Sequence, residues 1–504
     1  MVLRRHAWLA CVFVVSLSVR VAWVSQARVT PITDFRIYDR LAMGVLRTGE
    51  YGGGYRLAYR PPGYPLFLAG VYGVFGHSYP AAGYAAAVLG ALSSALVATL
   101  GARAVSRRTG VIAGLLHALS PTALAYTPLL ATENLAVPLV LMTTVLLAGA
   151  DSGGRQARPI ALAGLSGIAC GLLLLVRPAG LFFVPAWALL ALYSFMRRQW
   201  RPWVALAFLG ATAGIVGPWL MRNQRLLGAA TLGTNGGGNL LMANNDLAVT
   251  GGTYEPALRP YRNLPELESD RRMKTEALAW ICTHPGRYLL LCGVRAVRLL
   301  GTSPDPWAGR YLCPTAEHDA LITRSHDGRL AADVDLDNER RLWDVRHAND
   351  RVLAGVRVAI APLVLVALAL SAARWRALAI VGLPALCYLG GLSATFVQER
   401  FRELADPLLA IPLAALVGDI VAGGADLGPR PRRWVKGIVA LALVGAVALL
   451  HVTGRTEGWY RLSGPAVPET AERPDTDGQT ALSVVRLAEP ATQSAAERGR
   501  PVEQ

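Results

Sequence analysis

The stretch PIALAGLSGIACGLLLLV, residues 159–176, decides the fold class of this chain. It contains no charged side chain and is long enough to cross the hydrocarbon core of a bilayer as a helix. Apolar blocks of roughly 17–22 residues recur along the chain and have the length of membrane spans. The 504 residues are 53% hydrophobic and only 17% charged, with a mean hydropathy of +0.36. A soluble chain carries about 25% charged residues, so the sequence predicts an all-α polytopic membrane protein.

Eleven clear spans are predicted, and two shorter apolar blocks bring the expected range to 11–13 transmembrane helices. The clear spans lie near residues 7–25, 80–101, 109–130 (broken at Pro121), 134–150, 159–176, 179–196, 202–220, 352–372, 376–396, 404–422 and 434–452. The shorter blocks are 61–76, which follows a basic Arg-Pro-Pro sequence, and 286–301, which carries arginines at helical spacing. We expect both to be short interfacial or re-entrant helices.

Arginines in the turns between spans set the predicted orientation, because cytoplasmic loops carry an excess of basic residues. The N-terminus, flanked by Arg4 and Arg5, is placed in the cytoplasm, and the outer side receives loops 26–60 and 221–351. This distribution assigns the net charge of +16 to membrane orientation and not to a nucleic-acid-binding face. The arginine-rich, alanine-rich composition is typical of a bacterial genome, so a bacterial plasma membrane is expected.

Residues 1–452 are predicted to form one transmembrane domain, in which 26–60 is a first catalytic outer loop and 221–351 a long outer loop. The tail, residues 453–504, is polar and without a long apolar run, so we expect it to be disordered outside the membrane. Six cysteines show no paired spacing, and the pairing of Cys282 with Cys313 stays open.

The first outer loop contains TDFRIYDRLA, residues 33–42, in which Asp34 and Tyr38 share one face of a short helix. Asp39 lies well round that helix from Asp34. Two interpretations of Asp34 stand side by side: a carboxylate that favours the helix N-terminus, or a general base held at the membrane surface.

Two further residues stand where apolar sequence begins. Arg60 opens RPPGYPLF, where it either snorkels to lipid headgroups or binds a lipid-linked phosphate. Glu133 lies between two apolar runs, where an acid is costly unless it caps a helix, is paired or is functional. Arg177, at the end of the span 159–176, is interpreted as a membrane anchor.

Late in the chain, the sequence QERFRELAD, residues 398–406, gathers acids and arginines between two spans on the outer side. Arg400 and Arg402 run against the positive-inside trend there. They either form salt bridges with the local acids or bind an anionic substrate.

Taken together, these segments resemble the C-type (GT-C) glycosyltransferases, in the bacterial branch related to protein O-mannosyltransferases and the lipid A aminoarabinose transferase. The resemblance rests on ordered, individually unspecific motifs across residues 30–410. They are TDFRIYDRLA, RPPGYPLFLAG, TEN at a broken helix, LLVRP, NGGGNLLMANN and RFRELADPLL.

This resemblance implies inverting transfer of one hexose or pentose from a polyprenyl-phosphate carrier to an acceptor on the outer face. Asp34 matches the catalytic acid of the family and would deprotonate the acceptor. The other implied site residues bind substrate: Arg60, Arg400 and Arg402 would hold the carrier phosphate, and Tyr38 and Glu133 would line the pocket.

One departure from the family concerns the second acid that follows the first in many relatives, because here Phe35 follows Asp34. Whether Glu133 or Asp39 supplies a second carboxylate stays open, as does the use of a divalent metal. No cofactor beyond the lipid-linked donor is implied.

Two other function classes are weighed against the transferase. A transporter or flippase of an anionic lipid would use the same arginines without chemistry, and a scaffold subunit of an envelope-building complex would tolerate their loss. In every case the expected partners are membrane lipids and not nucleic acid. For the transferase, the acceptor (protein, glycan or glycolipid) is left open.

Overall fold

The structure is a computed structural model that describes residues 2–27, 29, 31, 33–52, 56–150, 157–196, 202–246, 248, 255–261, 263–297, 299 and 375–421. Four predictions fall outside these residues: the spans at 352–372 and 434–452, the tail 453–504, and the cysteine at position 313, whose pairing with Cys282 stays open.

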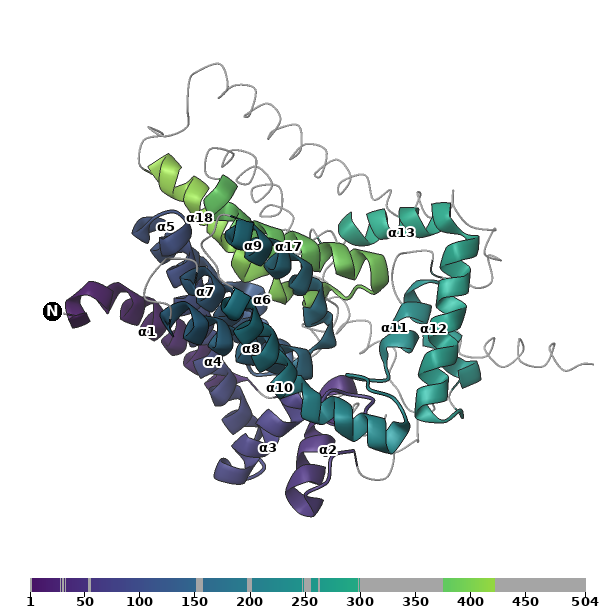
Figure 1. Ribbon diagram of the computed structural model, residues 1–504. Coiled ribbons are helices and arrows are strands. Elements are labelled where there is room, and N and C mark those ends of the chain that lie inside the picture. The colour runs from purple at the N-terminus through teal and green to yellow at the C-terminus, as the bar shows by residue number, and fades with distance from the viewer. Residues whose placement is uncertain are drawn as a thin grey trace, which may run out of the picture. The chain divides into compact units, whose positions relative to one another are not determined.

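The described residues form helices joined by turns and loops, and no strand occurs among them (Figure 1). The α-helices are α1 (Val2–Gln26), α2 (Thr33–Thr48), α3 (Gly63–Phe75), α4 (Tyr79–Ala104), α5 (Arg107–Ala118), α6 (Pro121–Tyr126), α7 (Glu133–Ala150), α8 (Ala157–Val176), α9 (Val184–Met196), α10 (Pro202–Leu227), α11 (Gly236–Ala243), α12 (Glu266–Thr283), α13 (Pro285–Val297), α17 (Trp375–Thr395) and α18 (Asp406–Val421). Three 3₁₀ helices complete the set: η1 (Pro178–Phe183), η2 (Glu255–Tyr261) and η5 (Glu399–Leu404).

Five of the described helices are long and apolar enough to cross a membrane. They contain the segments Ala7–Gln26, Tyr79–Ala104, Glu133–Ala150, Arg158–Val176 and Pro202–Leu227. The predicted fold class, an all-α polytopic membrane protein, is confirmed. The number of spans, 11–13, stays a prediction.

The block 109–130 is broken in the structure where the sequence predicts a break. Helix α5 ends at Ala118, and α6 begins at Pro121. Ser120 caps α6 by accepting a hydrogen bond from the backbone N–H of Ala123, at 3.4 Å, and proline is well suited to the first turn of a helix.

The two short apolar blocks form helices α3 and α13. Helix α3 has 13 residues, a length of about 20 Å, which is too short to cross a hydrocarbon core of about 30 Å. Helix α13 packs against α17. Its Arg295 does not face the membrane surface as expected: it is fully buried and donates hydrogen bonds to the carbonyls of Ala243 and Ser393.

Close packing of α8 against α10 depends on small residues. A Cβ atom added at Gly171 would lie 2.7 Å from Cβ of Ile215 on α10, closer than van der Waals contact permits. Helices in membranes associate through such small-residue faces, which allow their backbones to approach. Helix α8 also packs on α7, while α4 packs on α1, α5 and α7.

These helices bring together three stretches that are distant in the sequence. They are the first turn of α2, the connection between α2 and α3, and η5. Helix α2 packs on α3, and η5 packs on α7 and α18. The phenol of Tyr388 on α17 donates a hydrogen bond to the carbonyl of Phe401, at 3.0 Å, and so fixes η5 against that helix.

Candidate active site

Asp34 lies between two guanidinium groups. Nη2 of Arg60 donates to one carboxylate oxygen of Asp34 at 2.5 Å, and Nη2 of Arg400 donates to the other at 2.7 Å. The three side chains are 15–21% exposed, so the cluster is largely shielded from solvent and still reachable. Residues 34, 60 and 400, which the sequence analysis selected separately, therefore meet in one place.

A second ion pair adjoins this cluster. Nη1 of Arg177 donates to Oε1 of Glu133 at 2.7 Å, and both side chains are buried. Thr132 ties the pair together, because it donates to Glu133 and accepts from Arg177. Nε of Arg400 lies 3.8 Å from the same Glu133 oxygen, so Arg400 links both carboxylates.

Aromatic rings surround the guanidinium groups. Arg177 and Arg400 lie over the ring of Phe401, with distances to the ring centre of 4.0 and 5.5 Å. Arg60 lies 4.9 Å from the ring centre of Tyr59 and 6.0 Å from that of Tyr38. Such rings attract a cation and exclude water from it, which strengthens the electrostatic interactions of the site.

Tyr38 forms part of the wall of the site, one helical turn after Asp34. Its side chain is buried, and its ring packs edge-on against Tyr64 with 5.4 Å between ring centres. Burial, together with the charge of the nearby Asp34, raises the pKa of Tyr38, although the arginines oppose this shift. Tyr38 is therefore a neutral hydrogen-bonding group at physiological pH.

The arginines decide the ionisation of Asp34. Burial alone would raise the pKa of Asp34, but the charges of Arg60 and Arg400 outweigh it and bring the pKa below its ordinary value. In the opposite sense, burial would lower the pKa of Arg400, but Glu133 and Asp34 raise it above its ordinary value. Asp34 and Arg400 are therefore both charged at neutral pH.

Arg402 lies apart from this network. Its Nε donates to Asp406 at 2.5 Å, and its Nη1 donates to the carbonyl of Leu299 at 3.1 Å. This is the salt bridge with a local acid that the sequence analysis weighed as an alternative. The binding of a carrier phosphate by Arg402 stays a prediction.

Asp39, the other acid of α2, belongs to a separate group. It accepts hydrogen bonds from the phenols of Tyr72 and Tyr79 and lies 2.8 Å from Nε2 of His77. Of the two acids weighed as a second carboxylate, Glu133 is the one that is linked to Asp34, through Arg400.

The donor set around Asp34 does not fit a metal ion. Both carboxylate oxygens of Asp34 accept hydrogen bonds from guanidinium groups, and a cluster with three arginines repels a further cation. In the part of the chain that the structure describes, no three His, Cys, Asp or Glu side chains are grouped so that they could hold a metal.

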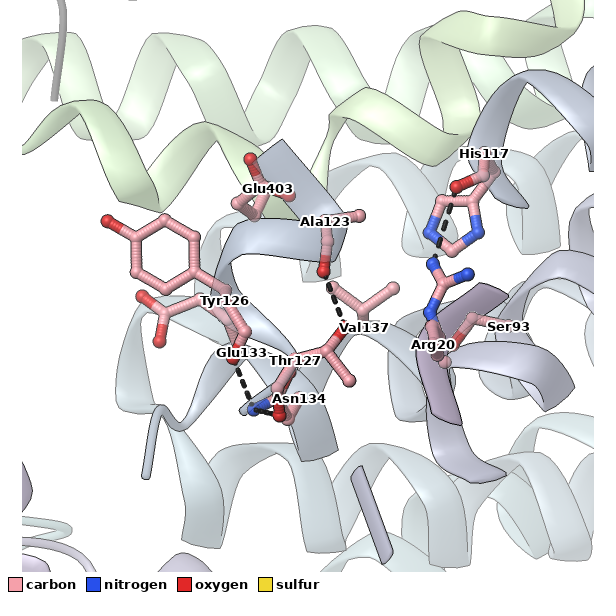
Figure 2. Close-up of a pocket in the computed structure, with 11 residues that line it drawn as sticks. Arg20, Ser93, His117, Ala123, Tyr126, Thr127, Glu133, Asn134, Val137 and Glu403 are labelled. Atoms are coloured by element: carbon pink, nitrogen blue, oxygen red, sulfur yellow. Dashed lines mark hydrogen bonds between the residues drawn. The ribbon is translucent and has the colours of Figure 1, made fainter. Parts of the chain in front are cut away.

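Glu133 also lines a small cavity whose wall is part polar and part apolar (Figure 2). Its volume of about 30 Å³ is enough for ordered water, since a cavity needs at least about 10–15 Å³ to hold one water molecule. Arg20 and His117 lie at one end and Glu133 and Glu403 at the other. Arg20 is fully buried and donates to the carbonyls of His117 and Ala118, which lie at the end of α5.

Arg177 is the site residue whose place the sequence analysis missed, because it was interpreted as an anchor. Its position directly after a span is typical of anchors, and only the contact with Glu133, 44 residues earlier, reveals the other role. The signal that could have revealed this role was its partner, Glu133, because an acid at a break between apolar runs requires a nearby cation.

Comparison with known families adds an independent observation. Residues 59–221 match the family model described as dolichyl-phosphate-mannose-protein mannosyltransferase. This match confirms the resemblance to the C-type glycosyltransferases. The matched part contains Arg60, Glu133 and Arg177.

Two solved structures are also similar to this chain, at low identity. ArnT from Cupriavidus metallidurans bound to undecaprenyl phosphate is 14% identical, with a TM-score of 0.47, over 88% of this chain and 64% of that chain. The archaeal oligosaccharyltransferase AglB from Archaeoglobus fulgidus, in complex with an inhibitory peptide and a dolichol-phosphate, is 15% identical, with a TM-score of 0.44, over 99% of this chain and 61% of that chain. This chain thus spans about three fifths of the length of each. A search of curated proteins found no match.

Proposed function

We propose that this protein transfers one hexose or pentose from a polyprenyl-phosphate carrier to a hydroxyl group of an acceptor at the outer face of the membrane. The observation that carries the proposal is the carboxylate of Asp34, held between the guanidinium groups of Arg60 and Arg400. A base next to two phosphate-binding cations is what an inverting displacement at a sugar phosphate requires.

The charge of the cluster suits such a donor. Three arginines, Arg60, Arg177 and Arg400, face two carboxylates, Asp34 and Glu133, which leaves one net positive charge. A phosphodiester donor brings one negative charge, and the phosphate that leaves gains a second as the bond to the sugar breaks. Guanidinium groups already in place stabilise this growing charge without further reorganisation.

Asp34 becomes a stronger base when the donor binds. In the free protein, burial opposes the ionisation of Asp34, but Arg60 and Arg400 keep its pKa below the ordinary value. A donor phosphate competes for the same guanidinium groups, which releases the carboxylate and raises its pKa. The acceptor hydroxyl then gives its proton to Asp34 and attacks the sugar carbon, and the phosphate leaves with the electron pair of the broken bond.

The remaining residues have supporting roles in this proposal. Glu133 and Arg177 hold Arg400 in place, and Tyr38 closes one wall of the pocket. The Nε–H of Arg60 is buried without a hydrogen-bond partner among the residues the structure describes, so it is a donor for a substrate oxygen. Arg402 would reach the phosphate only after it leaves Asp406.

The location at the outer face follows from the positive-inside distribution of arginines, with the N-terminus in the cytoplasm. An enzyme on that face has no supply of nucleotide sugars, so a lipid-linked sugar is the natural donor. The name of the family model matched by residues 59–221, with its polyprenyl-type phosphate sugar, supports the same donor class. Residues 1–452 would carry the whole activity.

The test compares the wild-type protein in lipid with the variant Asp34→Asn. Each is incubated with a panel of polyprenyl-phospho-sugars and an envelope acceptor fraction, and the release of polyprenyl phosphate is measured. We expect the variant to lose turnover by about 10²–10⁴-fold. The matched control is Asp246→Asn, which removes an exposed carboxylate outside the cluster.

Carrier binding without turnover across the panel, unchanged in Asp34→Asn, would refute the transferase. That outcome would favour the transporter or flippase of an anionic lipid.

A further inference from the structure

The segment that carries Arg60 is held by a carboxylate from a distant part of the chain. Glu266, the first residue of α12, accepts a hydrogen bond from the backbone N–H of Leu57 at 2.7 Å and another from that of Ala58 at 3.0 Å. Each oxygen of the carboxylate serves one of two consecutive amides. Hydrogen bonds to an ionised acceptor are roughly twice as strong as neutral ones, so this contact fixes the backbone two residues before Arg60.

Thr234, which precedes α11, strengthens the same contact. Its hydroxyl donates to Glu266 at 2.5 Å, and its backbone N–H donates to the carbonyl of Ala58 at 3.0 Å. Ala58 is fully buried and is therefore bonded through both its amide and its carbonyl. The backbone around residue 58 has little freedom to move while Glu266 is in place.

The rest of the segment is closed on itself by other groups. Arg222 on α10 donates to the carbonyls of Tyr51 and Leu57, at 2.7 and 3.1 Å, and the phenol of Tyr51 donates to the carbonyl of Arg60 at 2.9 Å. Gly52 has a φ of +82°, and a Cβ there would lie 2.7 Å from the carbonyl oxygen of Arg56. The described residues 51–52 and 56–60 are thus held close together, and Glu266 binds the amides of Leu57 and Ala58.

We propose that Glu266 is a positioning residue for the transfer reaction: it holds the backbone of Leu57 and Ala58, and thereby places the guanidinium group of Arg60 against Asp34 and the donor phosphate. The inference rests on the proposed function. It gives the chain after α10 a role in binding the donor, because this part of the protein supplies the acceptor of both amide hydrogen bonds.

A purely local role for Glu266 makes a different prediction. Acids in the first turn of a helix favour its N-terminus, and Glu268 lies in the same turn of α12. Glu268 is paired with Arg272 on the exposed side and makes no contact with residues 57–58 in the structure. Glu268→Gln therefore removes the same charge from the same turn and is the matched control for Glu266→Gln.

The first measurement is hydrogen exchange of the amides of Leu57 and Ala58 in the full-length protein in lipid, and it needs no turnover. Glu266→Gln should speed the exchange of both amides about tenfold or more, because one of the two bonds and the charge of the acceptor are lost. Glu268→Gln should leave this exchange unchanged. Thr234→Val, which removes one hydroxyl and keeps the carboxylate, should have a smaller effect in the same direction.

The second measurement is the steady-state rate against donor concentration, with a polyprenyl-phospho-sugar that the wild-type protein uses. Glu266→Gln should raise the donor KM about tenfold, while kcat changes less than about threefold. Rescue by Glu266→Asp is expected to be partial, because the shorter side chain keeps the charge and reaches one amide.

Unchanged exchange in Glu266→Gln, a KM shift no larger than that of Glu268→Gln, or a fall in kcat at constant KM would each overturn the inference. Absence of turnover in the wild-type protein would refute the proposed function instead. The exchange result would then still show whether Glu266 holds residues 57–58, so the two failures can be told apart.

Discussion

Arg177 and Glu133 offer a quantitative test of how the site is held together. Both side chains are at least nine-tenths buried, with exposed fractions of 9% and 3%, and their charged atoms are 2.7 Å apart. Arg177→Met leaves a buried carboxylate without its main partner. The double variant Arg177→Met with Glu133→Gln removes both charges. Its free energy of unfolding should therefore be higher than the sum of the effects of the two single substitutions predicts.

The magnitude follows from the geometry. Two unit charges about 4 Å apart at an effective dielectric constant of about 20 attract each other by about 4 kcal/mol. Loss of one partner from a buried pair typically costs about 3–5 kcal/mol. Because Arg400 lies 3.8 Å from the same Glu133 oxygen and compensates in part, we expect about 3 kcal/mol for Arg177→Met and a coupling energy of about 2 kcal/mol between residues 133 and 177.

The assay is a double-mutant cycle on the free energy of unfolding, measured by denaturant titration in lipid bicelles. The control cycle uses Arg272→Met and Glu268→Gln, a pair whose side chains are 60% and 43% exposed, for which we expect a coupling energy of about 1 kcal/mol or less. If the effects at Arg177 and Glu133 add to within about 0.5 kcal/mol, their interaction does not stabilise the site, and the argument for Glu133 as an anchor of Arg400 fails.

Two further predictions concern the members of the cluster that contact the donor. The pKa of Asp34 lies below its ordinary value of 3.8, so its ionised form adds stability above pH 3.8, and this stability is lost as the pH falls through the folded-state pKa. The difference in unfolding free energy between the wild-type protein and Asp34→Asn should therefore shrink as the pH is lowered. A difference that stays constant with pH would contradict the ion pairs of Asp34. Arg60→Lys keeps the charge and loses the planar fork, so the donor KM should rise about tenfold, whereas Arg47→Lys at the exposed end of α2 should leave it unchanged in the same rate assay.

The fold class could be predicted from the sequence because the membrane imposes a length on every apolar block. Residues 159–176, for example, allow only a spanning helix, and α8 ends at Val176. The break at Pro121 was equally visible, since a serine followed by proline starts a new helix. The buried position of Arg295 was not visible, because its partners are carbonyls on α11 and α17 and periodicity within one helix does not show them.

The site was predictable where a residue type contradicts its surroundings. Asp34, Glu133 and Arg400 stand out because they are charged residues next to apolar runs on the predicted outer side. A charge in such a place is costly unless it is paired or functional. Arg177 and Arg402 show the limit of this approach, because an arginine beside a span suits an anchor, a structural pair or a ligand-binding group equally well. The choice depends on the rotation of the helix that carries it: Arg177 faces Glu133, and Arg402 faces Asp406.

Glu266 shows a further limit, since a carboxylate that accepts hydrogen bonds from two backbone N–H groups and one hydroxyl has no side chain of opposite charge as its partner. Two of its partners, Leu57 and Ala58, lie more than 200 residues earlier and are apolar. Any residue type at positions 57 and 58 except proline would offer the same amides. Sequence reasoning that looks for opposite charges therefore finds the members of the cluster, but it does not find the group that positions one of them.

The distribution of the three arginines over separate elements explains why the site needs such positioning. Arg60 comes from a loop, Arg177 from the end of α8 and Arg400 from η5, and three like charges that converge on one place repel each other. Asp34 and Glu133 offset two of these charges and leave the third uncompensated. Rigid backbone contacts, those of Glu266 with residues 57–58 and of Tyr388 with residue 401, can keep that third charge near the others until an anionic donor binds. A flexible loop would let Arg60 move to solvent, and the donor would then meet two arginines and two carboxylates with no net charge.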